Sequence, residues 1–161
     1  MAELASRLRP QLQATVLPIL RRLSAKTGST ALLSVADGDQ ALILLTEEPA
    51  DTTFHLAVRQ GARHPLDRGA DGIAILAGRP RSSDDSDEVI RARELGYAVT
   101  IGALQAGAIG VAAPIVTSDW ATSSIGIVQL GGECDPKVSE VVIAAAAEAA
   151  KRLVGDYGDA R

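Results

Sequence analysis

Few side chains in this sequence could carry out catalysis. The only imidazoles are His55 and His64, and nucleophilic catalysis needs a nucleophile and a base within hydrogen-bonding reach. His64 shares a loop with Asp67, so the two could form a catalytic pair or a simple loop ion pair. A hydrolase would also require a serine such as Ser34 or Ser124 to meet them in space. No such arrangement follows from the sequence, and we expect the chain not to be an enzyme.

Metal and cofactor chemistry find equally little support. Cys134 is the single cysteine, which excludes an intrachain disulfide and a multi-cysteine zinc site. There is no HExxH pattern, phosphate-binding loop or dinucleotide fingerprint, so we expect no metal and no cofactor. Gly69 and Gly72 are three residues apart, as are Gly107 and Gly110. Such glycines can serve tight turns and close backbone packing. They can instead line a ligand pocket with backbone amides, and a helix that starts near Gly69 would then offer its N–H groups to an anion.

Composition places the 161 residues in one ordinary globular domain. Aromatic residues make up 2%, which argues against a stacking platform for single-stranded nucleic acid. No apolar run is long enough to span a membrane, and no secretory signal is present, so a cytoplasmic location is the default expectation. Residues 1–28 carry five basic groups and one acid, giving +4, which leaves −8 for the rest of a chain at −4. This basic segment would face an anion or a second module, or else form a solvated helix face.

Hydrophobic periodicity predicts how these residues are positioned in the first half of the chain. Apolar residues at spacings of three and four predict a helix over 4–26, which Pro10 and Pro18 should break or kink into two pieces. The next elements are a hairpin over 30–45, a half-buried strand over 52–59, a turn-rich loop through Pro65, and a short helix from about residue 70.

In the second half, a polar loop over 79–88 precedes a helix over 89–95 and a strand over 97–101. A second hairpin pairs 111–116 with 123–130, and Pro114 suggests an edge strand or a bulge. A final helix over 136–153 has Asp135 as its N-cap. This order predicts an α+β fold, loosely α/β, with helices packed on a mixed, largely antiparallel sheet.

Several segments together resemble one known family. GARHPLDRGADGIAILAG, RARELGYAV with GAIGVAAPIV, and SIGIVQLGG before a terminal helix resemble the effector-binding domain of IclR-family bacterial transcriptional regulators. VLPILRRLSAKTG followed by a hairpin is similar to that domain's entry helix and first strands. The resemblance implies a GAF-like fold, in which a curved, mostly antiparallel sheet of about six strands with flanking helices closes over a small-molecule cavity. It divides the chain into a connector helix region at 1–28, an effector-binding domain at 29–154 and a frayed tail at 155–161.

The resemblance also implies partners. It predicts a small-molecule effector, a homodimer or homotetramer, no membrane association, and contact with DNA only through an N-terminal winged helix-turn-helix that this chain lacks. The chain would then be an excised effector domain or a regulator without its DNA reader. The alternative is a structural dimerisation module whose ligand pocket has decayed.

Carried over by position, the family's cavity would be bordered by Leu56, Ala70, Asp71, Thr100, Gly110, Val128 and Leu130. Some members place hydroxyl residues at the last two positions and an acid at Ala103, and Asp71 replaces a small residue. A carboxylate facing the cavity would repel acids and favour amines or alcohols, and Asp71→Ala would then admit acids. Asp71 could instead turn to solvent or be neutralised by Arg68, one helical turn earlier.

Overall fold

The computed structural model describes residues 2–50, 58–118 and 120–158, of which 2–9 and 156–158 are described as backbone only. Leu56 and His55 lie outside the described residues. In chain order the elements are α1 (Ala2–Thr27), β1 (Thr30–Asp37), β2 (Gln40–Glu47), β3 (Arg63–Pro65), α2 (Ala70–Ala77), α3 (Asp87–Leu95), β4 (Ala98–Ile101), β5 (Ala108–Ile115), β6 (Ser123–Leu130) and α4 (Pro136–Gly158).

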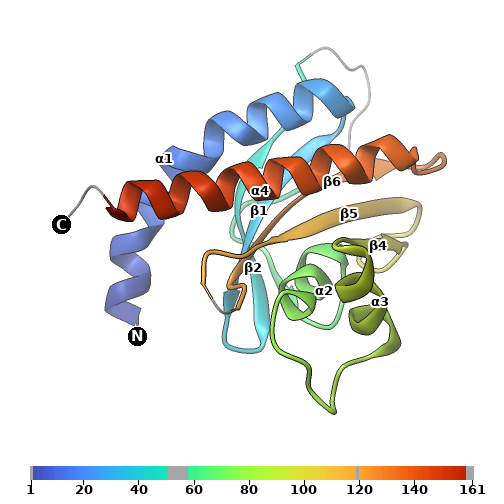
Figure 1. Cartoon of the computed structure of the whole chain (residues 1–161). Coiled ribbons are helices and arrows are strands. Elements are labelled where there is room, and N and C mark those ends of the chain that lie inside the picture. The colour runs from blue at the N-terminus through green and yellow to red at the C-terminus, as the bar shows by residue number, and fades with distance from the viewer. Residues whose placement is uncertain (1, 51–57, 119, 159–161) are drawn as a thin grey trace.

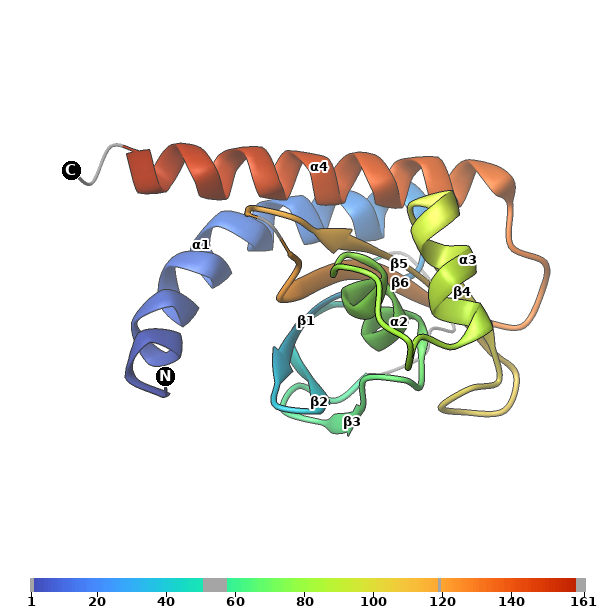
Figure 2. The same ribbon diagram turned by 60° about the horizontal axis from the view of Figure 1, so that its bottom comes forward.

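The six strands form one curled sheet in the order β3-β2-β1-β6-β5-β4, and every neighbouring pair is antiparallel. The long helices α1 and α4 lie across one face, while the short helices α2 and α3 lie on the other (Figure 1). Figure 2 shows the first three strands bending around below α2. This is the α+β architecture that the sequence predicts, with the curved six-stranded sheet that the family resemblance implies.

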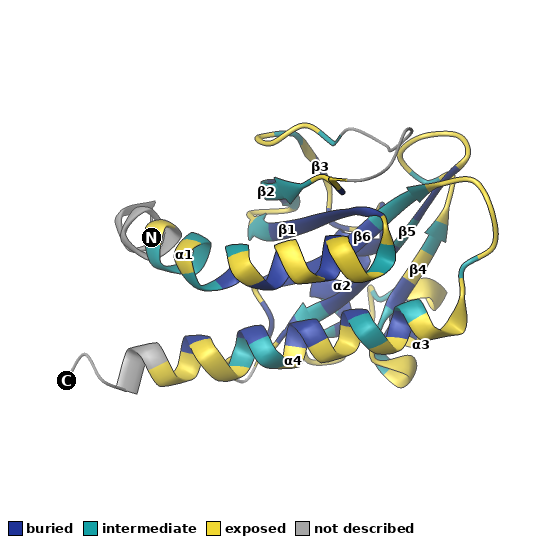
Figure 3. Ribbon diagram, turned by 90° about the horizontal axis from the view of Figure 1, so that it is seen from above, coloured by how far each residue is buried: buried dark blue, intermediate teal, exposed yellow. Residues whose placement is uncertain are grey.

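The larger core lies between the sheet and the two long helices. Side chains alternate along each strand, so Ile125 and Ile127 of β6 point into this layer. Ile19 and Leu20 of α1 and Val142 of α4 meet them there, and all are at most 2% exposed. Figure 3 shows the buried stripe of each long helix turned toward the sheet and the exposed stripe turned away, as expected of amphipathic helices.

The opposite layer is built from small residues, which lets α2 approach the sheet closely. Ala70, Ala74 and Ala77 of α2 pack with Ala98 of β4 and Ala112 of β5. The contact at the start of α2 is closer still, because a Cβ added at position 72 would lie 2.4 Å from the backbone oxygen of residue 66. Only glycine fits at that position, and the first turn of α2 is therefore held against the segment that follows β3.

The two prolines of α1 have a milder effect than predicted. Helix α1 is unbroken from Ala2 to Thr27, although it contains Pro10 and Pro18. Figures 1 and 2 show that it bends along its length, so the kink is present without a division into two pieces.

Pro114 lies in β5, which has neighbours on both sides, so the prediction of an edge strand is wrong. The physical reason is local. Strand β4 pairs only with Ile109–Ala112 and ends before Pro114, so the missing N–H of proline removes no bond from that ladder.

The remaining differences concern short or terminal segments. The loop predicted through Pro65 contains strand β3, whose central residue His64 pairs with Ala41 of β2. Of the strand predicted over 52–59, only Val58 and Arg59 fall within the described residues, and they are not in a strand. Helix α4 starts as predicted, since Asp135 Oδ1 accepts from the Lys137 N–H at 2.9 Å, but it runs on to residue 158, into the predicted tail.

Candidate functional site

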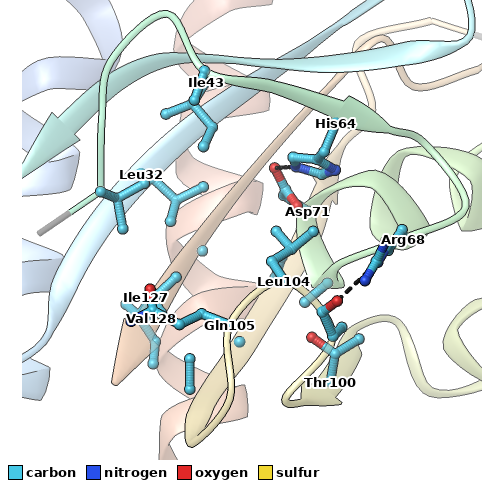
Figure 4. A pocket seen from close by; sticks show the side chains of 18 of the residues that line it. Leu32, Ile43, His64, Arg68, Asp71, Thr100, Leu104, Gln105, Ile127 and Val128 are labelled. Atoms are coloured by element: carbon cyan, nitrogen blue, oxygen red, sulfur yellow. Dashed lines mark hydrogen bonds and ion pairs between the residues drawn. The ribbon is translucent and has the colours of Figure 1, made fainter. Parts of the chain in front are cut away.

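A cavity of about 470 Å³ lies between the concave side of the sheet, the first turn of α2 and the loop that joins β4 to β5. Each of the six strands contributes at least one residue to its lining. Leu32 of β1, Ile43 of β2 and Val128 of β6 supply apolar wall, and Leu104 of the loop closes one side (Figure 4). The site is thus a product of the sheet's curvature, which brings edge strand β3 toward the opposite edge, β4.

The predicted site residues fall into three groups. Those that line the cavity are Ala70, Asp71, Thr100, Gly110 and Val128. Leu130 is not part of the lining, because it is the last residue of β6 and its side chain is 60% exposed. Leu56 lies outside the described residues, so its placement stays a prediction.

Asp71 is held by neighbours rather than presented to a ligand. Its Oδ2 accepts from the Ser34 hydroxyl at 2.6 Å and lies 2.9 Å from His64 Nε2. Its backbone oxygen accepts from the Ser124 hydroxyl at 2.9 Å. Asp71 is 6% exposed and His64 9%. The predictions that Asp71 turns to solvent, or pairs with Arg68, are therefore wrong, because the carboxylate is satisfied from β1 and β3 instead.

The same contacts revise the expectation for His64. It pairs with Asp71 and not with Asp67, whose side chain is exposed in the loop after β3. Burial lowers the pKa of His64, but the hydrogen bond and charge of Asp71, with the backbone of Pro65 and Arg68, outweigh it and raise the pKa above its ordinary 6.5. The imidazolium form of His64 therefore persists to higher pH than that of a free histidine.

A histidine, an aspartate and two serines therefore converge, but they do not form a catalytic arrangement. Ser34 donates to Asp71 and not to the imidazole, and His64 Nδ1 is engaged 3.0 Å from the Pro65 oxygen. Ser34 and Ser124 are 0% exposed, so a substrate could not reach either hydroxyl. A nucleophile must be both accessible and in contact with its base, and neither condition is met here.

Three arginines outside the predicted set of cavity residues also line the cavity: Arg59, Arg63 and Arg68. The Nε–H of Arg68 donates to the Ala103 oxygen at 2.9 Å, which ties the segment before α2 to the β4–β5 loop (Figure 4). Arg63 pairs with Asp37 at the end of β1. Because Asp71 is paired with His64, the described cavity wall carries net positive charge, the reverse of what the carboxylate alone suggested.

The sequence does hold a faint signal for this cluster. Arg59, Arg63 and Arg68 occur within ten residues, from the last residue of the predicted strand over 52–59 to the segment just before helix α2. Periodicity says nothing about the path of such a loop, so the three charges could not be assigned to one cavity from the sequence.

The first turn of α2 adds hydrogen-bond donors near these charges. Gly69 precedes the helix with φ 89° and provides no side-chain cap, and Ala70 lines the cavity. The first N–H groups of a helix have no intrahelical partner and favour anions. Leu104 packs over this turn, since a Cβ at Gly69 would lie 2.9 Å from its Cδ1.

Other candidate chemistry is not supported by the described part of the chain. No group of three or more His, Cys, Asp or Glu side chains within it is placed to hold a metal ion. Burial and the neighbouring Asp135 raise the pKa of Cys134, so its thiol is not activated as a nucleophile. None of the described helices has the length and apolarity needed to cross a membrane.

The described residues thus form a curled antiparallel sheet that encloses a small cavity and is backed by two long helices. The chain belongs to the family described as the C-terminal domain of the bacterial transcriptional regulator IclR, whose sequence model matches residues 8–90, just over half of the chain. No curated protein matches the chain.

Solved structures of transcriptional regulators share the fold. An IclR regulator from Alicyclobacillus acidocaldarius matches with a TM-score of 0.74 and 24% identity, over 89% of this chain and 67% of the other. The IclR of Thermotoga maritima matches with 0.78 and 19%, over 95% and 73%. An IclR homologue from Microbacterium hydrocarbonoxydans, complexed with 4-hydroxybenzoate, matches with 0.77 and 20%, over 91% and 69%.

Proposed function

We propose that this chain is the ligand-sensing domain of an IclR-type transcription regulator and that it binds a small organic acid in the cavity beneath the curled sheet. The observation that carries the proposal is the lining itself: an apolar chamber of about 470 Å³ with Arg59, Arg63 and Arg68 on its wall. Ligand sites commonly combine apolar walls with a few placed polar groups, which matches this lining.

The arginines decide the chemical class of the ligand. The carboxylate of Asp71 is engaged by Ser34 and His64, so it no longer argues for amines or alcohols. A guanidinium binds a carboxylate through two parallel hydrogen bonds, which an alcohol or an amide cannot accept with the same charge assistance. The complex of a related IclR homologue with 4-hydroxybenzoate supports an acid of that size.

Sensing also requires a response, and we assign it to association between copies of the chain. The domain would form a homodimer or homotetramer in the cytoplasm. It would act without catalysis and without a metal or cofactor. Edge strand β4 supports this role because Val99 and Ile101 are 43% and 78% exposed beside its open edge. Operator DNA would be bound by a winged helix-turn-helix module and not by the residues of this acidic domain.

The rival role is a structural dimerisation module with a decayed pocket. In that role the chamber should be filled by its own side chains, as unused apolar space usually is in a well-packed core. The open volume among the described residues favours sensing.

The direct test is a nuclear magnetic resonance screen of small carboxylic acids, each paired with its neutral amide. Acids should shift the amide signals of Ala70, Thr100, Gly110 and Val128, and their amides should do so weakly or not at all. Amides that bind as well as acids would refute the assignment of ligand class. If neither series binds the cavity while light scattering finds a dimer, the structural-module role replaces sensing.

A further inference from the structure

The buried His64–Asp71 pair forms part of the wall of the proposed ligand cavity. His64 comes from edge strand β3, Asp71 from the first turn of α2, and Ser34 of β1 shares the carboxylate oxygen that faces the imidazole. A surface ion pair would be screened by water, but this pair is not, because both side chains are below 10% exposed.

Both ring nitrogens of His64 face oxygen atoms that accept hydrogen bonds. Nδ1 lies 3.0 Å from the carbonyl oxygen of Pro65, and Nε2 lies 2.9 Å from Asp71 Oδ2. A neutral imidazole carries only one N–H, so with an ionised Asp71 one nitrogen would direct a lone pair at an oxygen. The geometry therefore requires one proton more in the pair than a neutral imidazole and an ionised carboxylate carry together.

The other described groups around His64 do not supply an alternative donor. Its strand partner on β2 is Ala41, which is apolar, and the hydroxyl of Ser34 is already donated to Asp71. Charged residues elsewhere on the described cavity wall are Arg59, Arg63 and Arg68, and Arg63 is paired with Asp37 outside it. Loss of the proton would leave the carboxylate of Asp71 as uncompensated negative charge beside the ligand.

We propose that His64 sets the charge preference of the cavity, so that binding of an anionic ligand is linked to retention of the proton shared by His64 and Asp71. The inference rests on the proposed function and couples ligand binding to the protonation of this pair. By linkage, a group whose proton favours the ligand must hold that proton more tightly in the complex. Affinity for an acid then falls by up to tenfold per pH unit above the pKa of free His64, until the pKa in the complex is reached.

The first test needs no ligand. The imidazole C–H signals of His64 and His55 are followed by nuclear magnetic resonance from about pH 5 to 9, and His55→Gln identifies which signal belongs to which residue. We expect the His64 signal to titrate above 6.5 in the wild type. A His64 titration at or below 6.5 would overturn the inference.

The second test uses benzoate and benzamide as probes, which match in shape and differ in charge. Calorimetry at about pH 7.5 in two buffers of different ionisation enthalpy measures proton uptake directly. Binding of benzoate should take up a fraction of one proton in the wild type and none in His64→Gln, and binding of benzamide should take up none in either protein.

The outcomes separate the two proposals. Benzoate binding that is independent of pH and takes up no proton overturns the role of His64 while leaving the proposed function intact. If no acid binds at any pH, the proposed function is wrong. The titration of His64 in the free protein then still shows whether His64 and Asp71 share a proton.

Discussion

Replacement of Asp71 by alanine should destabilise the domain strongly, although a small residue was expected at this position from the family resemblance. The carboxylate accepts from the Ser34 hydroxyl at 2.6 Å and contacts His64 at 2.9 Å, and the variant would leave both groups buried without an acceptor. An unsatisfied buried donor costs about 1–3 kcal/mol, and breaking a buried charged pair costs about 3–5 kcal/mol. We expect a loss of about 3–5 kcal/mol in the free energy of unfolding.

Urea unfolding followed by circular dichroism measures this loss. For a slope of about 2 kcal/mol per molar urea, the midpoint should fall by about 2 M. Asp71→Asn is the matched variant: its amide can donate to a neutral His64, so it should lose less. Asp67→Ala, which removes an exposed carboxylate from the neighbouring loop, should change the unfolding free energy by less than about 0.5 kcal/mol.

The dependence on pH gives a second check. Because folding raises the pKa of His64, the stabilisation from its pairing is complete below 6.5 and is lost as the pH rises through the raised value. The difference in the free energy of unfolding between the wild type and Asp71→Asn should therefore become smaller as the pH rises. If Asp71→Ala unfolds at the same urea concentration as Asp67→Ala, the pair does not stabilise the domain and the reasoning is refuted.

Three further predictions use the same urea assay. Gly72→Ala should lower the free energy of unfolding by about 1–3 kcal/mol, because its Cβ would meet a backbone oxygen at 2.4 Å. Gly155→Ala in helix α4, where nothing lies within 4 Å of an added Cβ, should raise the free energy of unfolding by about 0.5–1 kcal/mol. Equal effects of the two substitutions would contradict the packing of α2. Arg93→Ala should lower the unfolding midpoint because Arg93 donates to the carbonyls of Leu76 and Ala77 at the end of α2 and pairs with Asp85; an unchanged midpoint would count against that clamp. Asp135→Ala should cost about 0.5–2 kcal/mol through loss of the α4 N-cap, and Asp135→Ser should recover most of it if capping is the cause.

The sequence predicts the elements of this fold better than the path of its loops. Periodicity and capping residues suffice for both hairpins, for α2 and for the start of α4, since each depends on neighbours in sequence. Strand β3 is three residues long and forms only because β2 is already beside it, so no local pattern could indicate it. Pro114 misleads for a related reason: whether a proline breaks a ladder depends on where the neighbouring strand stops.

For the candidate site, the positions of the lining residues could be predicted better than the charge of the cavity. The family resemblance predicts Ala70, Thr100, Gly110 and Val128 at the cavity, and all four are among its lining residues, while their contact with a ligand stays a prediction. The charge of the cavity did not transfer, because it depends on contacts between residues distant in sequence. Asp71 and Ser34 are 37 residues apart and meet only after the sheet has formed.

If the cavity binds an organic acid through its arginines, calorimetry on Arg68→Gln should show it. The ligand is the tightest-binding acid from the paired screen, and Arg91→Gln is the control, because Arg91 is exposed on α3 and outside the cavity lining. We expect a loss of at least tenfold in affinity for the acid in Arg68→Gln, no change for its neutral amide, and no change for either ligand in Arg91→Gln. Equal affinity of the wild type and Arg68→Gln for the acid would contradict it.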